Sequence, residues 1–504
     1  MPKPEHHEHR SCSCGCDDGL DRREFLTVAG AGSGIAAFSS LTSLTQDAAA
    51  EDRVASVGNT KTPAKIKAVF LYPPSSTFAN DPEGWWSWPG NDYDAEGRQR
   101  MYVEAIRGME EKLGVVVDVH EQSIGSAAEA DRVAAELGDG QYDGILIVMF
   151  YNNSLGEADK LLAAAAELSM PAIFYIGLGV KHGSITRYRR EGVYLIQSLD
   201  NLDAIEYGLR MIGAKKRMTQ TLLLSITEAP EIREGVEKFF GMTVRVLPFE
   251  LYAERFAAIP IDADAHALIE QFKSGASELR DVSQESLENA AKAHLAIKSL
   301  LAEHGADGLT MNCLRRGMLK PCMSFATLNG ELIPAACEND FAAMYGQLLG
   351  QLLTGRGGFQ HNPAFETERN HYYGSHCTCS PKLNGPDGKT LPHILRRFAH
   401  TNEGSCAIQV FWTPGDPVTM LHYYAGETPE LDVYAGRVVA SHQMPPAGGC
   451  TTNVEIKLTD RTDVCMVEGH HNVLFVGDHS RRFRLFANLF GMKLKGSGYE
   501  GHAF

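Results

Sequence analysis

Residues able to bind a metal ion gather in the stretch between Pro334 and Pro381. Glu338 stands between a short apolar run and a segment whose apolar residues recur at helical spacing, so we expect it at the exit of a buried strand. His361, Asn362 and His376 follow, and we expect a loop to bring them within reach of Glu338. One carboxylate and two or three imidazoles can hold a divalent cation and leave coordination positions open for a substrate.

A distant segment adds further imidazole. His470 and His471 directly precede the apolar run Val473-Leu474-Phe475, which is typical of a strand. If both histidines belong to that strand, their side chains point to opposite faces, and at most one of them is a ligand. In a chain with 19 histidines, a competing interpretation is that such neighbours are ordinary surface or core residues.

Four short segments carry a resemblance to a known superfamily. They are Cys322–Gly330, 336–340 (ACEND), 374–376 (GSH) and 470–474 (HHNVL). In this order, over roughly the last two hundred residues, they are similar to segments that hold metal ligands in L-fucose isomerases and L-arabinose isomerases. On these motifs the chain is identified as a member of the fucose/arabinose isomerase superfamily.

The resemblance implies an aldose-ketose isomerase that acts on an L-fucose- or L-arabinose-like sugar through a metal-bound cis-enediol. A divalent metal, with Mn²⁺ the expected ion, would act as a Lewis acid on O1 and O2, and groups beside it would move the proton. Glu338, His361, His376 and His471 are the expected metal ligands. Glu338 and His361 are also the expected catalytic residues, and Asn362 and His376 the expected sugar contacts.

The sequence departs from the superfamily pattern at the second carboxylate. Fucose isomerases place an Asp after the helix and arabinose isomerases a Glu, whereas this chain has His361 and Asn362 there and no acidic residue before Glu366. The departure leaves two other functions open. One is an exported sugar-binding or sensing protein without isomerase activity, and the other is a lyase or epimerase acting on a related polyhydroxy compound.

The segments that must position these residues indicate an α/β fold. Between residues 60 and 215, short apolar runs alternate with amphipathic segments, which predicts a Rossmann-like domain with a parallel sheet covered on both faces. A second Rossmann-like α/β domain is expected over 216–330, and a β-rich, barrel-like domain with the metal site over 331–504. The expected strands are 66–71, 114–119, 144–150, 172–178, 193–196, 222–226, 244–249, 308–314, 408–412, 418–424, 431–440 and 454–458. The expected helices include 126–137, 157–168, 264–275, 283–304 and 481–490.

An aromatic cluster follows the first expected strand. Trp85, Trp86 and Trp88 account for three of the 4 tryptophans. Aromatic rings stack well on the apolar C–H faces of sugars, so the cluster is a candidate sugar-binding surface. Burial of the same rings against a neighbouring subunit is an equally good interpretation.

The N-terminal residues are typical of an export signal. Arg22-Arg23-Glu24-Phe25-Leu26 is a twin-arginine signature, and a weakly apolar stretch and a small-residue site at 48–50 follow it. Residues 1–50 are therefore predicted to direct the folded protein through the twin-arginine export machinery to the periplasm. A disordered tail that contains two arginines by chance is the alternative.

Composition limits the partners of the chain. A net charge of −16 argues against nucleic acid or an anionic membrane and is compatible with a neutral sugar. Eight of the 11 cysteines follow the signal, at wide spacings that do not indicate a disulfide scaffold, so mostly free thiols are expected. The resemblance implies a homo-oligomer, because neighbouring protomers in the superfamily help to close each active site.

Overall fold

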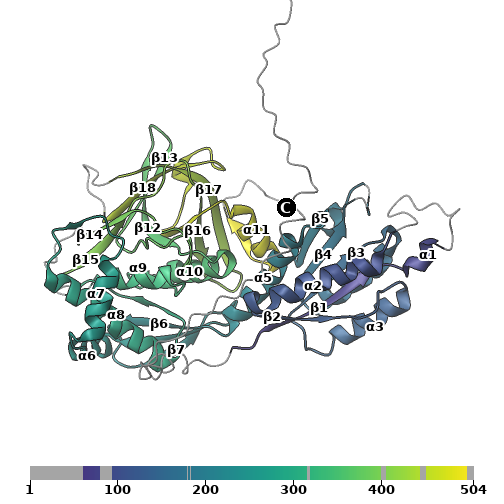
Figure 1. Ribbon diagram of the computed structural model, residues 1–504, viewed down its shortest axis with the longest axis horizontal. Helices are drawn as coiled ribbons and strands as arrows, with labels where there is room; N and C mark the ends of the chain where they lie inside the picture. Colours follow the sequence, from purple (N-terminus) through teal and green to yellow (C-terminus); the bar gives the residue numbers. More distant parts are fainter. Residues whose placement is uncertain are drawn as a thin grey trace, which may run out of the picture. The chain divides into compact units, whose positions relative to one another are not determined.

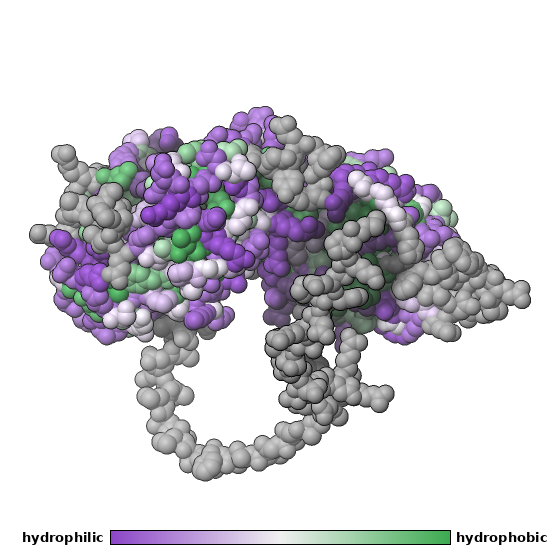
Figure 2. Space-filling model, turned by 90° about the horizontal axis from the view of Figure 1, so that it is seen from above, coloured by the Kyte–Doolittle hydropathy of each residue, from purple (hydrophilic) through white to green (hydrophobic). Residues whose placement is uncertain are grey.

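The computed structural model describes residues 61–79, 93–178, 180–181, 183–314, 318–398, 404–442 and 450–495 of the 504-residue chain (Figure 1). The proposed signal at 1–50 lies outside the described residues, as do Trp85, Trp86 and Trp88. On the face shown in Figure 2, the described surface is mainly hydrophilic with small apolar patches. No helix in the described ranges is both long and apolar enough to cross a membrane.

The first α/β region is built on a five-stranded parallel sheet of order β2-β1-β3-β4-β5. Alternate residues of β1 enter two different cores, because successive side chains of a strand point to opposite faces. Ile66 and Phe70 pack with α2 and α5, whereas Val69 and Leu71 pack with α3 and α4. The predicted parallel sheet with helices on both faces is confirmed. The elements are β1 (Ala64–Leu71), α1 (Ser75–Ala79), α2 (Ala95–Leu113), β2 (Val115–Val119), α3 (Ala127–Leu137), β3 (Gly144–Met149), α4 (Leu155–Glu167), β4 (Ala172–Gly177), β5 (Val193–Ser198) and α5 (Leu202–Thr219).

The second region contains a sheet of order β11-β10-β6-β8-β7, which is parallel except for the edge strand β7. Helices α6, α8 and α9 share a core with one face of this sheet, and α10 packs on the other. The elements are β6 (Leu222–Thr227), β7 (Arg233–Val236), β8 (Thr243–Pro248), α6 (Phe249–Ala258), α7 (Ala263–Lys273), α8 (Gln284–His304), β10 (Gly308–Met311), α9 (Cys322–Gly330), β11 (Ala335–Cys337) and α10 (Phe341–Thr354). Glu338 follows β11 directly, as predicted. The description of both regions as Rossmann-like domains, and the domain boundaries, stay predictions.

Six antiparallel strands of the C-terminal region close into a barrel. Their order is β16-β19-β12-β13-β18-β17, and β17 pairs again with β16. Closure leaves no free sheet edge, so the barrel-like prediction is confirmed. The strands are β12 (Phe359–Glu366), β13 (His371–His376), β16 (Pro417–Tyr424), β17 (Glu430–Ser441), β18 (Thr452–Leu458) and β19 (Asn472–Val476). Around the barrel lie β9 (Leu279–Arg280), β14 (His393–Arg397), β15 (Cys406–Val410), α11 (Ser480–Leu489) and β20 (Lys493–Lys495).

One prediction about this region is wrong. His361, Asn362 and His376 do not lie on a loop but in β12 and β13, two neighbouring strands of the barrel wall. Strand β12 was not predicted because its first residue, Phe359, is followed by two buried polar residues, Gln360 and His361, so apolar and polar residues do not alternate along it. The strands place these side chains more rigidly than a loop would.

Helix α10 lies directly against barrel strands β16 and β19 (Figure 1). The close approach depends on two glycines on one face of the helix. Gly346 contacts Leu421 and Val473, and a Cβ added to Gly350 would lie 1.9 Å from the Phe475 ring carbon Cζ. Because α10 begins just after Glu338, this packing fixes the distance between the carboxylate and the barrel.

The Gly350→Ala protein is expected to be about 1–3 kcal/mol less stable than wild type, because the new methyl group overpacks the contact with Phe475. Denaturant unfolding measures the change. Gly108→Ala is the matched control, because Gly108 lies exposed in α2 with nothing within 4 Å of an added Cβ. That substitution should stabilise the protein by up to about 1 kcal/mol, and equal effects at both sites would contradict the close packing of α10.

Candidate metal centre

Glu338 occupies a strained turn between β11 and α10. Its φ is 64° and that of Asn339 is 55°, so two consecutive non-glycine residues have left-handed backbone, at a cost of about 1–2 kcal/mol each. Tertiary contacts hold the turn: the Asn339 amide donates to the Met311 carbonyl at 2.9 Å, and Ser225 Oγ donates to Asn339 Oδ1 at 2.8 Å. Strain of this kind concentrates at functional sites.

Two barrel histidines face the Glu338 carboxylate from different strands. His376 ends β13 and places Nε2 3.4 Å from Glu338 Oε1, while His471 precedes β19 and places Nε2 3.6 Å from Oε2. Their ring centroids are 5.3 Å apart and the ring planes are almost perpendicular, at 82°. Both imidazoles are buried, whereas 20% of the Glu338 side chain is exposed. The structure therefore brings together three of the four predicted ligands.

His470 also approaches the carboxylate, from the solvent side. Its side chain is 76% exposed, and Nε2 lies 4.0 Å from Glu338 Oε2. The condition under which the two histidines would point to opposite faces of a strand is not met, because β19 begins only at Asn472. Gly469, with a φ of 98°, precedes a bend in which the rings of His470 and His471 lie 4.2 Å apart. Ligand atoms of Glu338, His470 and His471 all lie within 4.8 Å of one another.

Asp340 orients His471, a role that the sequence analysis did not assign. Its Oδ2 accepts a hydrogen bond from His471 Nδ1 at 2.7 Å, and its Oδ1 accepts one from the Ala343 amide at 2.8 Å, which caps α10. Burial raises the pKa of Asp340, but these hydrogen bonds outweigh it and hold the pKa below its usual value. An ionised carboxylate only accepts, so Nδ1 of His471 carries a proton, and in the neutral imidazole Nε2 then keeps a lone pair.

The lone pair on His471 Nε2 has no partner among the described residues. The atom is buried, makes no hydrogen bond and faces Glu338. Buried polar atoms are rarely left without a partner, and a missing ion is one explanation when they are. One carboxylate and two imidazoles that leave open positions suit Mn²⁺, Fe²⁺, Co²⁺ or Zn²⁺. Glu338 and His471 thus fit a divalent metal ion with His470 as the third residue, because ligand atoms of these three residues lie within 4.8 Å of one another. His376 contacts Glu338 but does not belong to that group.

The protonation states of Glu338 and His376 also bear on metal binding. The hydrogen bond from His376 lowers the pKa of Glu338 below its usual value despite burial, so the carboxylate stays ionised. Burial lowers the pKa of His376, but the Cys377 sulfur and the Glu338 carboxylate together outweigh it and raise the pKa to about 10. A metal ion must therefore displace a proton from His376.

Mn²⁺ affinity is expected to rise about tenfold per pH unit below the His376 pKa of about 10, because each ion bound releases one proton. The affinity gained is lost as the pH falls. Calorimetric titration in two buffers with different ionisation enthalpies counts the protons released. A count of zero at pH 7 would contradict a protonated His376 in the metal-free protein.

His361 belongs to neither group of potential ligands that the structure brings together. Its Nδ1 donates to the Phe359 carbonyl at 2.9 Å, which leaves the lone pair on Nε2, a buried atom without a hydrogen bond. Its ring packs beside Tyr372 and against Gly374. Burial lowers the pKa of His361 to about 3, so the imidazole is neutral and weakly basic. Its roles as ligand and catalytic residue stay predictions.

Asn362 lies on the other face of the barrel wall. It pairs with Ser375 in the register of β12 and β13, and paired residues of antiparallel strands share a face. The alternation therefore separates Asn362 from His376, the next residue after Ser375. Its Oδ1 is buried without a hydrogen bond. The contact of Asn362 with a sugar stays a prediction, as does stacking on the tryptophans.

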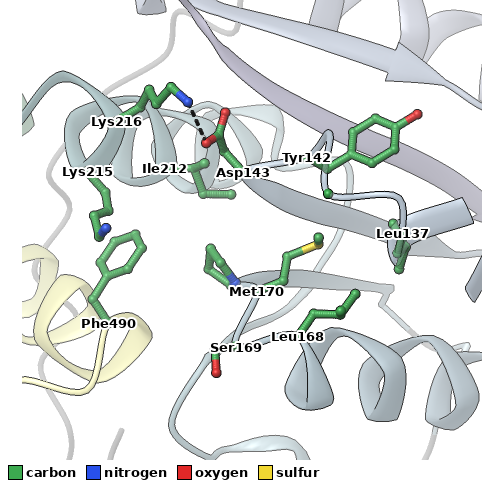
Figure 3. A pocket seen from close by; sticks show the side chains of 12 residues that line it. Leu137, Tyr142, Asp143, Leu168, Ser169, Met170, Ile212, Lys215, Lys216 and Phe490 are labelled. Atoms are coloured by element: carbon green, nitrogen blue, oxygen red, sulfur yellow. Dashed lines mark hydrogen bonds and ion pairs between the residues drawn. The ribbon is translucent and has the colours of Figure 1, made fainter. Parts of the chain in front are cut away.

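A separate cavity of about 260 Å³ lies at the amino ends of β3 and β4 (Figure 3). Lys215 and Phe490 extend toward it, and Asp143 on its wall pairs with Lys216 at 2.9 Å. Burial lowers the pKa of Lys215. None of the residues facing Glu338 lines this cavity, so it is not the candidate metal centre.

Comparison with models of known protein families finds no match, and no curated protein matches the chain. The structure itself defines the class: a mixed α/β protein with a parallel sheet and a closed six-stranded antiparallel barrel. Its candidate centre joins Glu338, directly after strand β11, to His470 and His471, directly before strand β19, and these three residues are a possible metal-binding group.

Proposed function

We propose that the protein is a metal-dependent aldose-ketose isomerase acting on an L-fucose- or L-arabinose-like sugar. The observation that carries the proposal is the buried, unpartnered Nε2 of His471, which lies 3.6 Å from Glu338 Oε2. Asp340 fixes the tautomer that a metal ligand needs. When bound, a divalent ion such as Mn²⁺ would supply Lewis-acid stabilisation of the negative charge that develops on the sugar oxygens.

Glu338 is the residue best placed to move the proton. Isomerisation takes a proton from C2 of the aldose, forms a cis-enediol and returns a proton to C1, which requires a base that is ionised at the start of each turnover. The lowered pKa of Glu338 meets that requirement. His376 and His471 each approach a different oxygen of the carboxylate and so fix its plane.

A dissolved sugar can reach this group from the side of His470. The His470 ring is 76% exposed and borders Glu338, which is itself 20% exposed. The buried His376 and His471 lie behind the carboxylate and are shielded from water. These exposures support access of a small-molecule substrate from the side of His470.

A sugar-binding or sensing protein without isomerase activity is the second candidate. His361 stands where the superfamily has its second carboxylate, and burial lowers its pKa to about 3. Such an imidazole is too weak a base to replace a carboxylate in proton abstraction from carbon. If catalysis needs two bases, the scaffold would bind the sugar without converting it.

The cellular context belongs to the proposal as well. The twin-arginine motif at Arg22-Arg23 supports export to the periplasm with the metal inserted before transport, since this route carries folded proteins. The proposal also includes two Rossmann-like domains before the barrel and a homo-oligomeric assembly, as the resemblance to the superfamily implies.

Proton exchange in deuterated water tests the proposal. Purified protein with Mn²⁺ should exchange the C2 proton of L-fucose or L-arabinose, as followed by NMR, and chelator-treated protein should not. Exchange that persists without metal would contradict the mechanism. Bound metal with no exchange of either sugar would favour the sugar-binding candidate.

A further inference from the structure

Five thiols gather behind the Glu338 turn. The sulfur atoms of Cys322 and Cys377 are 3.1 Å apart. Cys337 and Cys450 also lie near the Cys377 thiol; Cys322, Cys337 and Cys450 together hold its pKa well below the usual value, while Cys313 and Cys377 raise the pKa of the Cys337 thiol. Cysteine accounts for only 11 of 504 residues, so a cluster of this density needs an explanation.

Four of the five thiols come from four separate parts of the fold, and the fifth, Cys313, follows β10 (Gly308–Met311). Cys322 begins α9 and Cys337 ends β11, both in the second α/β region. Cys377 follows β13 and Cys450 precedes β18, both in the barrel. Cys322, Cys337 and Cys377 are each at most 5% exposed, while Cys450 is half-buried. The cluster thus lies on the junction between the parallel sheet and the barrel.

The spacing of the donor atoms suits a soft metal ion. Ligand atoms of Cys337, Cys377 and His376 lie within 4.8 Å of one another. Tetrahedral zinc with Zn–S bonds of about 2.3 Å holds its sulfur ligands about 3.8 Å apart. Cys322 lies close to Cys377 but outside this group, as does Cys450, so both side chains must rotate toward Cys337 for four thiolates to bind one ion. Thiolates select Zn²⁺ over hard cations such as Mn²⁺.

His376 separates this cluster from the Glu338 group. Its Nδ1 lies 3.7 Å from the Cys377 sulfur and 3.3 Å from Thr378 Oγ1, whereas its Nε2 lies 3.4 Å from Glu338 Oε1. One side of the ring therefore borders sulfur donors and the other a carboxylate. Two centres with different metal preferences can exist side by side.

We propose that Cys322, Cys337 and Cys377, with Cys450 as the fourth ligand, bind a structural Zn²⁺ ion. The ion would join the second α/β region to the barrel. It would also fix the backbone next to Glu338 and His376, the direct neighbours of Cys337 and Cys377 in sequence. The inference of this site does not rest on the proposed isomerase activity.

Metal analysis and cobalt substitution of the full chain, purified under reducing conditions, test the site. Wild type should retain one equivalent of zinc, and the Co²⁺-substituted protein should show the sulfur-to-cobalt charge-transfer band. Cys322→Ser and Cys450→Ser should each lose most of the band and of the zinc. Cys465→Ser is the matched control, because Cys465 is exposed, and it should keep both. Glu338→Gln should keep the band even where it loses Mn²⁺.

A wild-type protein without the band, or a band that survives both Cys322→Ser and Cys450→Ser, would overturn the proposal. Thiol titration of the denatured protein without reductant is a second test, because it counts the cysteines that are not in disulfides. Two thiols fewer than the sequence contains in wild type, but not in Cys322→Ser, would show that Cys322 forms a disulfide, which would also overturn the proposal. If Cys322→Ser does not fold, the wild-type spectrum and the half-buried Cys450→Ser decide.

Discussion

The Glu338→Gln protein is expected to bind Mn²⁺ at least about 100-fold more weakly than wild type, since loss of an outer partner alone costs about 10- to 100-fold. The amide removes the negative charge and leaves one ligand oxygen where there were two. It also removes the base, so metal-dependent exchange at C2 should disappear. Calorimetric titration measures the affinity and NMR in deuterated water the exchange.

Glu331→Gln is the matched control for this substitution. Glu331 follows α9 and pairs with Lys298 at 3.3 Å near the surface, where such pairs contribute little. Its affinity for Mn²⁺ and its stability should equal those of wild type. If Glu338→Gln binds Mn²⁺ as wild type does, the metal centre lies elsewhere in the chain.

The sequence predicted elements well where burial follows a simple period. The helix after Glu338 was expected from its apolar spacing, and α10 ends at Thr354 with Gly355 as its left-handed cap. The prediction from sequence failed at β12, where buried polar side chains interrupt the alternation of apolar and polar residues that is typical of a strand. The Gln360 amide accepts from the Cys337 N–H at 2.7 Å and donates to the Cys337 carbonyl at 3.2 Å, so it extends the edge of the sheet as a strand would. A hydrophobic pattern cannot reveal that the Gln360 side chain makes the hydrogen bonds that the backbone of a neighbouring strand would otherwise make.

The site was predictable to the extent that short motifs contain its residues. Glu338, His376 and His471 were expected together, and the structure places them together. Asp340 directly precedes α10, a position at which aspartate indicates an N-cap. The hydrogen bond between its second carboxylate oxygen and His471 could not be predicted, because only the folded chain brings these distant residues together. The sulfur cluster left no such signal, because its cysteines are spread from Cys313 to Cys450 without a C-x-x-C pair.

Replacing Asp340 with asparagine is expected to weaken Mn²⁺ binding about 10- to 100-fold with little change in stability. Asparagine still accepts from the Ala343 amide and caps α10. Its NH₂ group, however, would face the Nδ1–H of His471, so two donors oppose each other. The imidazole must then move its proton to Nε2 or turn away, and either change removes the lone pair that faces Glu338.

Asp262→Asn separates this effect from capping, because Asp262 caps α7 through the Asp264 and Ala265 amides and is exposed. Both variants should unfold at nearly the wild-type denaturant concentration, and only Asp340→Asn should lose affinity in calorimetric titration. Asp340→Ala should lose affinity and about 1 kcal/mol of stability, because it also removes the cap. If Asp340→Asn binds Mn²⁺ with wild-type affinity, Asp340 does not set the His471 tautomer. The unpartnered Nε2 of His471 would then no longer be evidence for a metal ligand.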